Sequence, residues 1–87
     1  MDEKIKKVMS AVFEIPAEDI NDNSSPDSIV NWDSLHHMNL VIALEEEFNI
    51  IFNEDDISNM LNYKLIKLTL SEIFNIYRIY MILIYKI

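Results

Sequence analysis

Apolar residues near the N-terminus recur with the spacing of one helix face. Between residues 2 and 14 they stand three and four positions apart, at Ile5, Val8, Met9, Val12 and Phe13. This period predicts an amphipathic helix, and the acidic residues at positions 2 and 3 suit the positive N-terminal end of its dipole. The residue before a proline is pushed out of the helical region, so we expect the helix to end at Ile15–Pro16.

A long segment without helical periodicity follows. From Pro16 to Asp33 the chain is rich in Asn, Asp, Ser and Pro, which favour turns. So long a loop in a small domain is typically functional or held in place by apolar side chains of its own. The residues suited to hold it are Ile20, Ile29, Val30 and Trp32.

The rest of the chain predicts three more helical segments. We expect Ser34 to open a second helix that runs to about Phe48, with the serine hydroxyl as its N-cap. Residues 54–57, Glu-Asp-Asp-Ile, are typical of a short helical turn with acidic residues at its start. A last helix is predicted from about Asn62, because apolar residues continue at helical spacing to Tyr77.

The C-terminal tail, residues 79–87, is almost wholly apolar. Its apolar run between Arg78 and Lys86 is much shorter than the ~20 residues that a membrane-spanning helix needs, so we expect no membrane span. Three interpretations of this tail stay open: it extends the last helix, it forms an oligomer contact, or it is a disordered end. We take residues 1–78 as the domain.

The second predicted helix carries two apolar patches. At ~100° per residue, a core stripe collects Leu40, Val41, Leu44 and Phe48. A narrower patch on the far side collects Leu35, Met38 and Ile42, flanked by Glu45 and Glu46. A helix of a small bundle needs only one buried stripe. The second patch is therefore either a docking surface, whose glutamates meet basic residues of a partner, or a surface that the other helices bury.

Composition excludes several classes of protein. The 87 residues include no Cys and no Gly. A chain without Cys has no disulfide, no thiolate metal site and no Cys nucleophile. A chain without Gly lacks the glycine-rich phosphate-binding loops found in most ATP- and NAD-dependent enzymes. The N-terminus begins with charged residues, so we expect no secretory signal.

The formal net charge of −8 is unevenly distributed. Residues 8–63 contain twelve acidic residues and neither Lys nor Arg, whereas residues 64–87 have a net charge of +3. The acidic middle of the chain repels nucleic-acid phosphates and anionic lipids and favours basic protein surfaces. We therefore expect protein partners and no nucleic acid, with acidity that only keeps a small domain soluble as the alternative.

Residues at the start of the second helix suggest three kinds of site. A phosphate esterified to Ser34 would lie at the positive end of the helix dipole, although an N-cap role alone also explains a serine there. Asp33, Ser34 and His37 are the three residue types of a serine-hydrolase catalytic triad. The sequence shows no oxyanion hole or glycine turn to accompany them. Asp33 and His37 are too few ligands for a metal site. We expect no enzyme, no metal, and solvated histidines at 36 and 37 that could make docking pH-sensitive.

Residues from Trp32 to Phe48 carry a family resemblance. An Asp-Ser-Leu tripeptide heads a helix that ends in Leu-Glu-Glu-Glu-Phe, about thirty residues after the start of an amphipathic first helix and before a short acidic turn. In this combination the chain resembles the acyl carrier protein family over residues 2 to about 77. The resemblance implies an all-α fold: a bundle of three long helices and one short helix, with a long loop between the first two helices.

The resemblance also implies a chemistry at Ser34. In the family, a phosphopantetheinyl transferase joins a 4′-phosphopantetheine arm from coenzyme A to the matching serine, and the terminal thiol of the arm holds an acyl group as a thioester. This cofactor would supply the sulfur that a chain without cysteine lacks. Asp33 and Leu35 would lie beside the arm. Enzymes that load and process the acyl group would carry basic patches. These patches would contact Leu35, Met38, Asn39, Ile42, Glu45 and Glu46 of this chain.

The chain departs from the family pattern near the arm. His36–His37 and Asn39 stand where acidic or small polar residues are usual, and Trp32 stands where a small residue is usual. The first two departures lower the negative charge next to the arm. Trp32 is seen more often in carriers of specialised pathways, so the partners of this chain need not be those of a housekeeping fatty-acid carrier.

Two functions therefore stay open. The first is a bacterial, cytoplasmic acyl carrier protein, monomeric, that serves fatty-acid or specialised biosynthesis. The second is an acidic helical interaction module that binds a basic protein partner and never carries an arm. The two functions share a fold, and they differ in whether Ser34 is modified.

Overall fold

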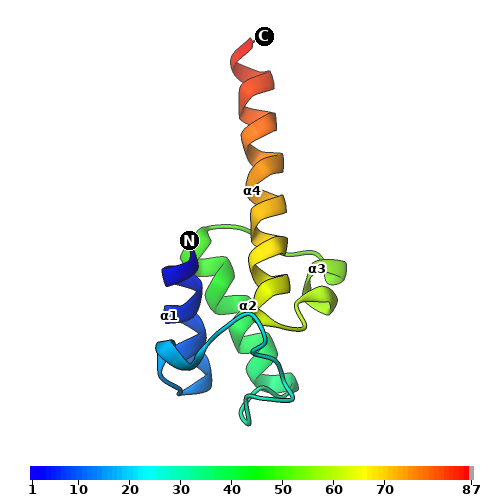
Figure 1. The fold of residues 1–87 in the computed structure, drawn as a ribbon. Coiled ribbons are helices and arrows are strands. Elements are labelled where there is room, and N and C mark those ends of the chain that lie inside the picture. The colour runs from blue at the N-terminus through cyan, green and yellow to red at the C-terminus, as the bar shows by residue number, and fades with distance from the viewer. Residues whose placement is uncertain (87) are drawn as a thin grey trace.

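The computed structural model describes residues 1–86, and over that range the chain forms helices and no strand (Figure 1). The elements are α1 (Asp2–Phe13), the 3₁₀ turn η1 (Ala17–Asp19), α2 (Ser34–Phe48), α3 (Glu54–Asn59) and α4 (Tyr63–Lys86). Three of these helices are long and α3 is short, and a long loop joins α1 to α2. The predicted all-α fold is therefore confirmed.

Local backbone chemistry sets the ends of the helices. α1 ends at Glu14, whose backbone is left-handed with φ 58°, just before the predicted boundary at Ile15–Pro16. α2 ends in the same way at Asn49, with φ 53°. α3 begins with two reciprocal hydrogen bonds: Asn53 Oδ1 accepts from the N–H of Asp56, and the Asp56 carboxylate accepts from the N–H of Asn53.

One hydrophobic core joins all the helices and the long loop. Its most buried residues are Ile5, Met9, Phe13, Ile20, Ile29, Trp32, Leu40, Val41, Leu44, Ile50, Phe52, Met60, Tyr63, Ile66 and Leu70. The core stripe predicted for the second helix is thus confirmed, with Phe48 packed at its edge. Burial of apolar side chains from α1, α2, α4 and the loops, with Ile57 of α3 packed against them, is what closes a domain this small.

The long loop is held by three of the four residues predicted to hold it. Ile20, Ile29 and Trp32 are buried. The N–H of Trp32 donates to the carbonyl of Ile29 at 3.0 Å, which closes a turn between these two buried residues. The expectation for Val30 is wrong. Val30 lies inside that turn and is 98% exposed.

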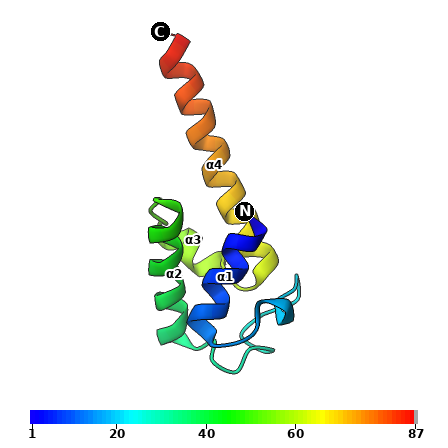
Figure 2. The same ribbon diagram turned by 90° about the vertical axis from the view of Figure 1, so that its left-hand side faces the viewer.

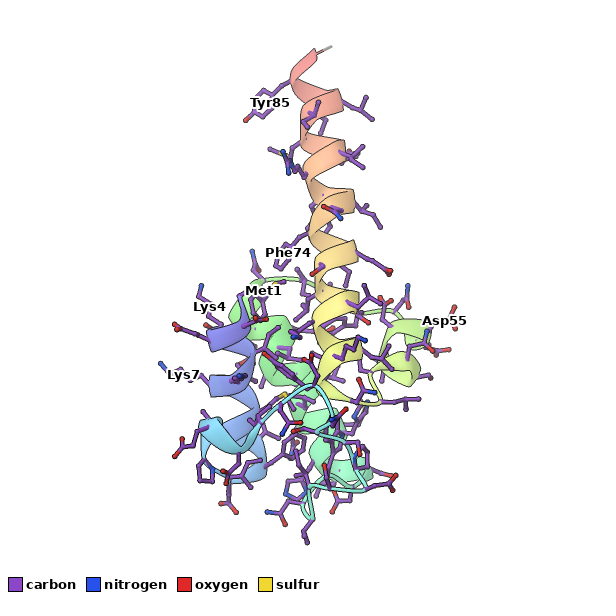
Figure 3. The ribbon with its side chains drawn as sticks, in the orientation of Figure 1. Met1, Lys4, Lys7, Asp55, Phe74 and Tyr85 are labelled. Atoms are coloured by element: carbon purple, nitrogen blue, oxygen red, sulfur yellow. The ribbon has the colours of Figure 1, made fainter. Side chains whose placement is uncertain are left out.

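α4 begins in the core and leaves it. Asn62 caps the helix, since its Oδ1 accepts from the N–H of Leu65 at 2.8 Å, and the first turns are buried. The rings of Phe48 and Phe74 meet edge to face with centroids 5.8 Å apart, and every residue from 75 to 85 is exposed. The helix therefore projects from the bundle (Figures 1 and 2). Figure 3 shows Phe74 at the rim of the bundle and Tyr85 near the far end of the projection.

The tail is part of this helix. Residues 79–86 continue α4, and residue 87 lies outside the described residues. The apolar run is therefore continuous with the helix that begins at Tyr63. The comparison with a membrane span treated this run as a separate short segment, which it is not. By length and composition alone, Tyr63–Tyr85 is long and apolar enough to cross a membrane. One such helix is weak support for a span, and only 11% of the apolar window is buried, so burial in the core does not by itself explain its composition.

Candidate functional site

The N-cap of α2 is Asp33. The expectation that Ser34 caps this helix is therefore wrong. Asp33 Oδ1 accepts from the backbone N–H of His36 at 2.8 Å, and its carbonyl accepts from the N–H of His37 at 2.8 Å. Both Asp and Ser are good N-caps, and the one that precedes the first helical residue takes the role. The hydrogen bond from the backbone N–H of His36 lowers the pKa of Asp33 below its ordinary value. The hydrogen bond from the His36 side chain makes a smaller contribution in the same direction.

Ser34 is the first residue of α2, and it is exposed. Because Asp33 does the capping, the fold does not need the Ser34 hydroxyl in that role. The hydroxyl lies where the backbone N–H groups of the first helical turn converge and where the helix dipole is positive. An anion attached to this oxygen is therefore stabilised by the helix itself.

His37 is a structural bridge, so the expectation of a solvated histidine is wrong at this position. The indole N–H of Trp32 donates to His37 Nδ1 at 2.9 Å, and His37 Nε2 lies 3.0 Å from the carbonyl oxygen of Ile57 in α3. The Trp32 ring also stacks on Phe13 of α1, with centroids 4.8 Å apart. The first turn of α2 is thereby tied to α1 on one side and to α3 on the other.

The two contacts fix the protonation of the ring. An indole N–H can only donate, so His37 Nδ1 is the acceptor and carries no proton. The ring proton is then on Nε2, which donates to the Ile57 carbonyl. His36 is half-buried as well, and its Nδ1 lies 2.8 Å from Asp33 Oδ1.

A groove of about 440 Å³ opens beside Ser34. It is lined by Pro26, Trp32, Asp33, Ser34, His37, Met38 and Leu61. No local pattern in the sequence marks Pro26 and Leu61 as site residues. They lie 8 positions before and 27 positions after Ser34, and only the folded chain brings them to it. The apolar neighbour most easily read from the sequence was Met38, which is on the same helix.

The second patch of α2 is exposed in the fold. Leu35 is 68% exposed, Met38 45% and Ile42 50%, and Asn39 and Glu46 are exposed as well. The alternative that other helices bury this patch is therefore wrong for residues 1–86. The patch begins at Ser34 and follows α2 away from it.

Glu45 is placed differently from Glu46. It is half-buried, and its Oε2 accepts from the backbone N–H of Phe52 at 2.9 Å. Its carbonyl also accepts from the N–H of Ile50 at 3.1 Å. Glu45 thus closes the turn that follows α2, whereas the Glu46 side chain faces solvent. Within residues 1–86 no group of three His, Asp or Glu side chains is arranged to hold a metal ion.

Comparison with proteins of known function gives consistent matches. A protein named acyl carrier protein from Buchnera aphidicola subsp. Schizaphis graminum is 38% identical over 56 residues, which are 64% of this chain and 71% of that protein. Acyl carrier protein of Nitratidesulfovibrio vulgaris, in strains DP4 and Hildenborough, is 31% identical over 64 residues, which are 74% of this chain and 84% of that protein. No family model matches the chain.

Proposed function

Because this chain belongs to the acyl carrier protein family, we propose that it carries an acyl or aminoacyl group as a thioester on a 4′-phosphopantetheine arm attached to Ser34. The observation that carries the proposal is the position of Ser34, exposed at the N-terminal end of a long helix whose cap is another residue. The family consists of carrier proteins, so the prediction that the chain is not an enzyme is confirmed.

The residues around Ser34 fit such an arm. The hydroxyl is accessible to a transferase, and the N-terminal end of α2 stabilises the negative charge of a phosphodiester. Pro26, Met38 and Leu61 give the adjoining groove apolar walls, and Asp33 and His37 give it polar ones. When attached, the arm supplies the thiol that the chain lacks.

The bridge through His37 gives the attachment point a fixed orientation. Trp32 and the Ile57 carbonyl hold His37 from two sides, one helical turn beyond Ser34. The exposed patch that starts at Leu35 then keeps a constant position relative to Ser34. A partner that binds this patch finds the arm in reach of its active site, since docking sets the effective concentration of the tethered group.

The partners of the proposed carrier are enzymes with basic surfaces. Leu35, Met38 and Ile42 offer apolar contacts, and Glu46 offers a charge to Lys or Arg at the rim. Asn39 lies on the same helix face, and Glu45 contributes negative charge beside it. These enzymes comprise a phosphopantetheinyl transferase and the enzymes of fatty-acid or specialised biosynthesis that load and process the acyl group, in the cytoplasm.

The proposal is tested by intact mass. Incubation of the purified chain with coenzyme A and a phosphopantetheinyl transferase of broad specificity adds the mass of one phosphopantetheinyl group. Ser34→Ala abolishes the addition, while Ser58→Ala, a change at another exposed serine, leaves it intact. If the wild-type mass stays unchanged with every transferase tried, the proposal is wrong and the chain is an acidic module that binds basic partners without an arm.

A further inference from the structure

The projecting part of α4 carries an apolar surface that no other described element covers. Ile76, Tyr77, Tyr80, Met81, Leu83 and Ile84 are between 45% and 64% exposed. These six side chains are neighbours on consecutive turns of one helix, and they lie outside the site at Ser34. A contiguous exposed apolar surface of this kind marks a contact with a partner.

The spacing of these residues is that of a helix that packs against another helix. Along α4 the intervals alternate between three and four residues, which defines what we call the α4 stripe: Tyr63, Ile66, Leu70, Ile73, Tyr77, Tyr80 and Ile84. Such alternation is the a and d pattern of coiled coils. The first three residues of the stripe are buried in the core, and the last three are exposed. The surface that packs inside the domain therefore continues outside it.

The flanks of the α4 stripe are apolar too. Beyond the core these positions hold Phe74, Ile76, Met81 and Leu83, whereas Asn75 and Arg78 fall on the opposite side of the helix. A broad apolar face is the pattern of a helix in a bundle. The face lacks helices to complete that bundle within residues 1–86.

We propose that α4 pairs antiparallel with α4 of a second copy of this chain. Charge favours this occupant and this direction. After Glu72 the only charged residues are Arg78 and Lys86, while the rest of the domain is strongly acidic. A parallel pair sets two acidic domains side by side, and like charges repel. An antiparallel pair keeps the domains apart and brings each basic segment to the acidic end of the other domain.

The acidic end in question is where α4 leaves the bundle. Glu46 and Glu47 stand next to Phe48, whose ring meets Phe74, and the N-terminus of α1 lies at the same end of the bundle (Figures 1 and 2). Asp2 and Glu3 are the first residues of that helix, but Lys4, Lys6 and Lys7 follow them and make residues 1–7 net positive. Glu46, Glu47 and Glu72 are therefore the acidic residues at this end that a second α4 can meet.

A groove at the base of the projection receives the second copy. It has a volume of about 240 Å³, with apolar walls from Ile51, Ile73, Ile76 and Tyr77 and acidic residues Asp56 and Glu72 at its edge. Pairing the stripes with Ile73 opposite Ile84 and Tyr77 opposite Tyr80 lays Met81 and Ile84 of the second copy beside this groove. Ile51, which is 81% exposed in the single chain, is covered by the same pairing.

The area is of the size that a stable dimer needs. A large side chain offers about 200 Å², so six that are half exposed give about 600 Å² per copy. The groove residues add to this, and standard protein interfaces bury about 800 Å² on each partner. The pairing does not involve Ser34, so the inference stands or falls independently of the proposed attachment.

The test compares two matched isoleucines by analytical ultracentrifugation of the full chain. Ile84 lies in the α4 stripe and is 47% exposed, whereas Ile82 lies on the opposite side and is 45% exposed. The wild type sediments with twice the mass of one chain. Ile84→Glu weakens association by at least about tenfold, because a carboxylate would be buried unpaired, and Ile82→Glu does not. A wild type that is monomeric at all concentrations overturns the proposal.

A bilayer is the competing occupant, because Ile79, Ile82 and Tyr85 make the far side of the projection partly apolar as well. Flotation with liposomes of neutral and of anionic lipid tests it. Recovery of the wild type with the liposomes, lost equally in Ile82→Glu and Ile84→Glu, overturns the dimer. Recovery in the lipid-free fraction, together with the sedimentation result above, supports it.

Cysteine cross-linking tests the direction, since the chain has no cysteine of its own. In the antiparallel pair the two Ile84 positions are 11 residues apart along the axis, about 16 Å, which is too far for a disulfide. A mixture of Ile73→Cys and Ile84→Cys chains therefore oxidises to a mixed dimer, and Ile84→Cys alone does not. Efficient cross-linking of Ile84→Cys alone shows a parallel pair and contradicts the proposal.

Discussion

The indole N–H of Trp32 donates a hydrogen bond of 2.9 Å to Nδ1 of His37. Through this one contact the loop that precedes α2 and the first turn of α2 become a single unit. The same imidazole continues to α3 through the Ile57 carbonyl. The proposed attachment point at Ser34 therefore lies on a turn that three elements hold, although Ser34 itself is exposed.

Trp32→Phe removes the donor of this hydrogen bond and keeps an aromatic ring to stack on Phe13. We expect a loss of about 1–2 kcal/mol in the free energy of unfolding, because the acceptor Nδ1 of the half-buried His37 is left without its partner. Urea unfolding followed by circular dichroism measures the loss. In parallel, ¹⁵N NMR of the imidazole shows the pure Nε2–H tautomer in the wild type and a mixture in the variant. A wild-type ring already mixed between tautomers would contradict the bridge.

Glu46→Lys tests the proposed docking surface of α2, and Glu47→Lys is its matched control. Both glutamates are exposed and both changes alter the net charge equally, but only Glu46 lies beside Ile42 and Met38 on the helix. We expect Glu46→Lys to slow transfer of the arm by a phosphopantetheinyl transferase on the order of tenfold, since a rim charge acts mainly on association. Rates of modification, measured by intact mass over time, should change little in Glu47→Lys. Equal slowing by the two changes would mean that only net charge matters.

Docking through this surface should also weaken with salt. Charges at the rim are screened beyond about 8–10 Å at physiological ionic strength. The rate of arm transfer to the wild type should therefore fall as salt rises, and Glu46→Lys should reduce the slope. A rate independent of salt would contradict an electrostatic contribution to docking.

Glu45 and Glu46 are neighbours in sequence with different tasks in the fold. Glu45→Ala removes the acceptor for the N–H of Phe52, and we expect it to destabilise the domain by about 1–2 kcal/mol. Glu46→Ala, at an exposed side chain, should leave stability within about 0.5 kcal/mol of the wild type. Urea midpoints of the two variants provide the comparison. Equal midpoints would show that the hydrogen bond of Glu45 contributes nothing in solution.

The helices were predictable because their signals are local. The period of apolar residues separated the buried side of α2, at Leu40 and Leu44, from the exposed side at Leu35 and Ile42. Proline 16 marked the end of the first helix to within two residues of Glu14. Local propensity does not choose between two adjacent N-caps, however. Asp33 and Ser34 are both suited to the position, and only the backbone geometry assigns it to Asp33.

The tertiary features of the site were not predictable from the same signals. His37 reads as a surface histidine in sequence, because the carbonyl that it binds belongs to Ile57, 20 residues further on. Leu61 reaches the groove beside Ser34 only after α3 has folded back. Likewise, the C-terminal tail reads as a separate segment after Arg78, and its helical state follows from α4, which the core nucleates at Tyr63.

Tyr63 links stability to alkaline pH. Burial raises the pKa of its phenol above the ordinary value, and the charge of Asp2 adds to the effect. The folded state therefore holds the phenolic proton more tightly than the unfolded state does. The stabilisation by the neutral phenol is complete below the unfolded pKa of about 10 and is lost as the pH rises through the folded pKa. We expect the urea midpoint of the wild type to fall steeply above pH ~10.

Tyr63→Phe separates this group from the other three tyrosines. Phenylalanine keeps the buried ring and has no proton to lose, so the midpoint of the variant should decline less over the same pH range. The difference in tyrosinate absorbance between wild type and variant gives the titration of Tyr63 directly, and it should lie above that of a tyrosine in an unfolded peptide. Parallel decline of the two midpoints would show that alkaline unfolding arises elsewhere, and the raised pKa of Tyr63 would then have no part in it.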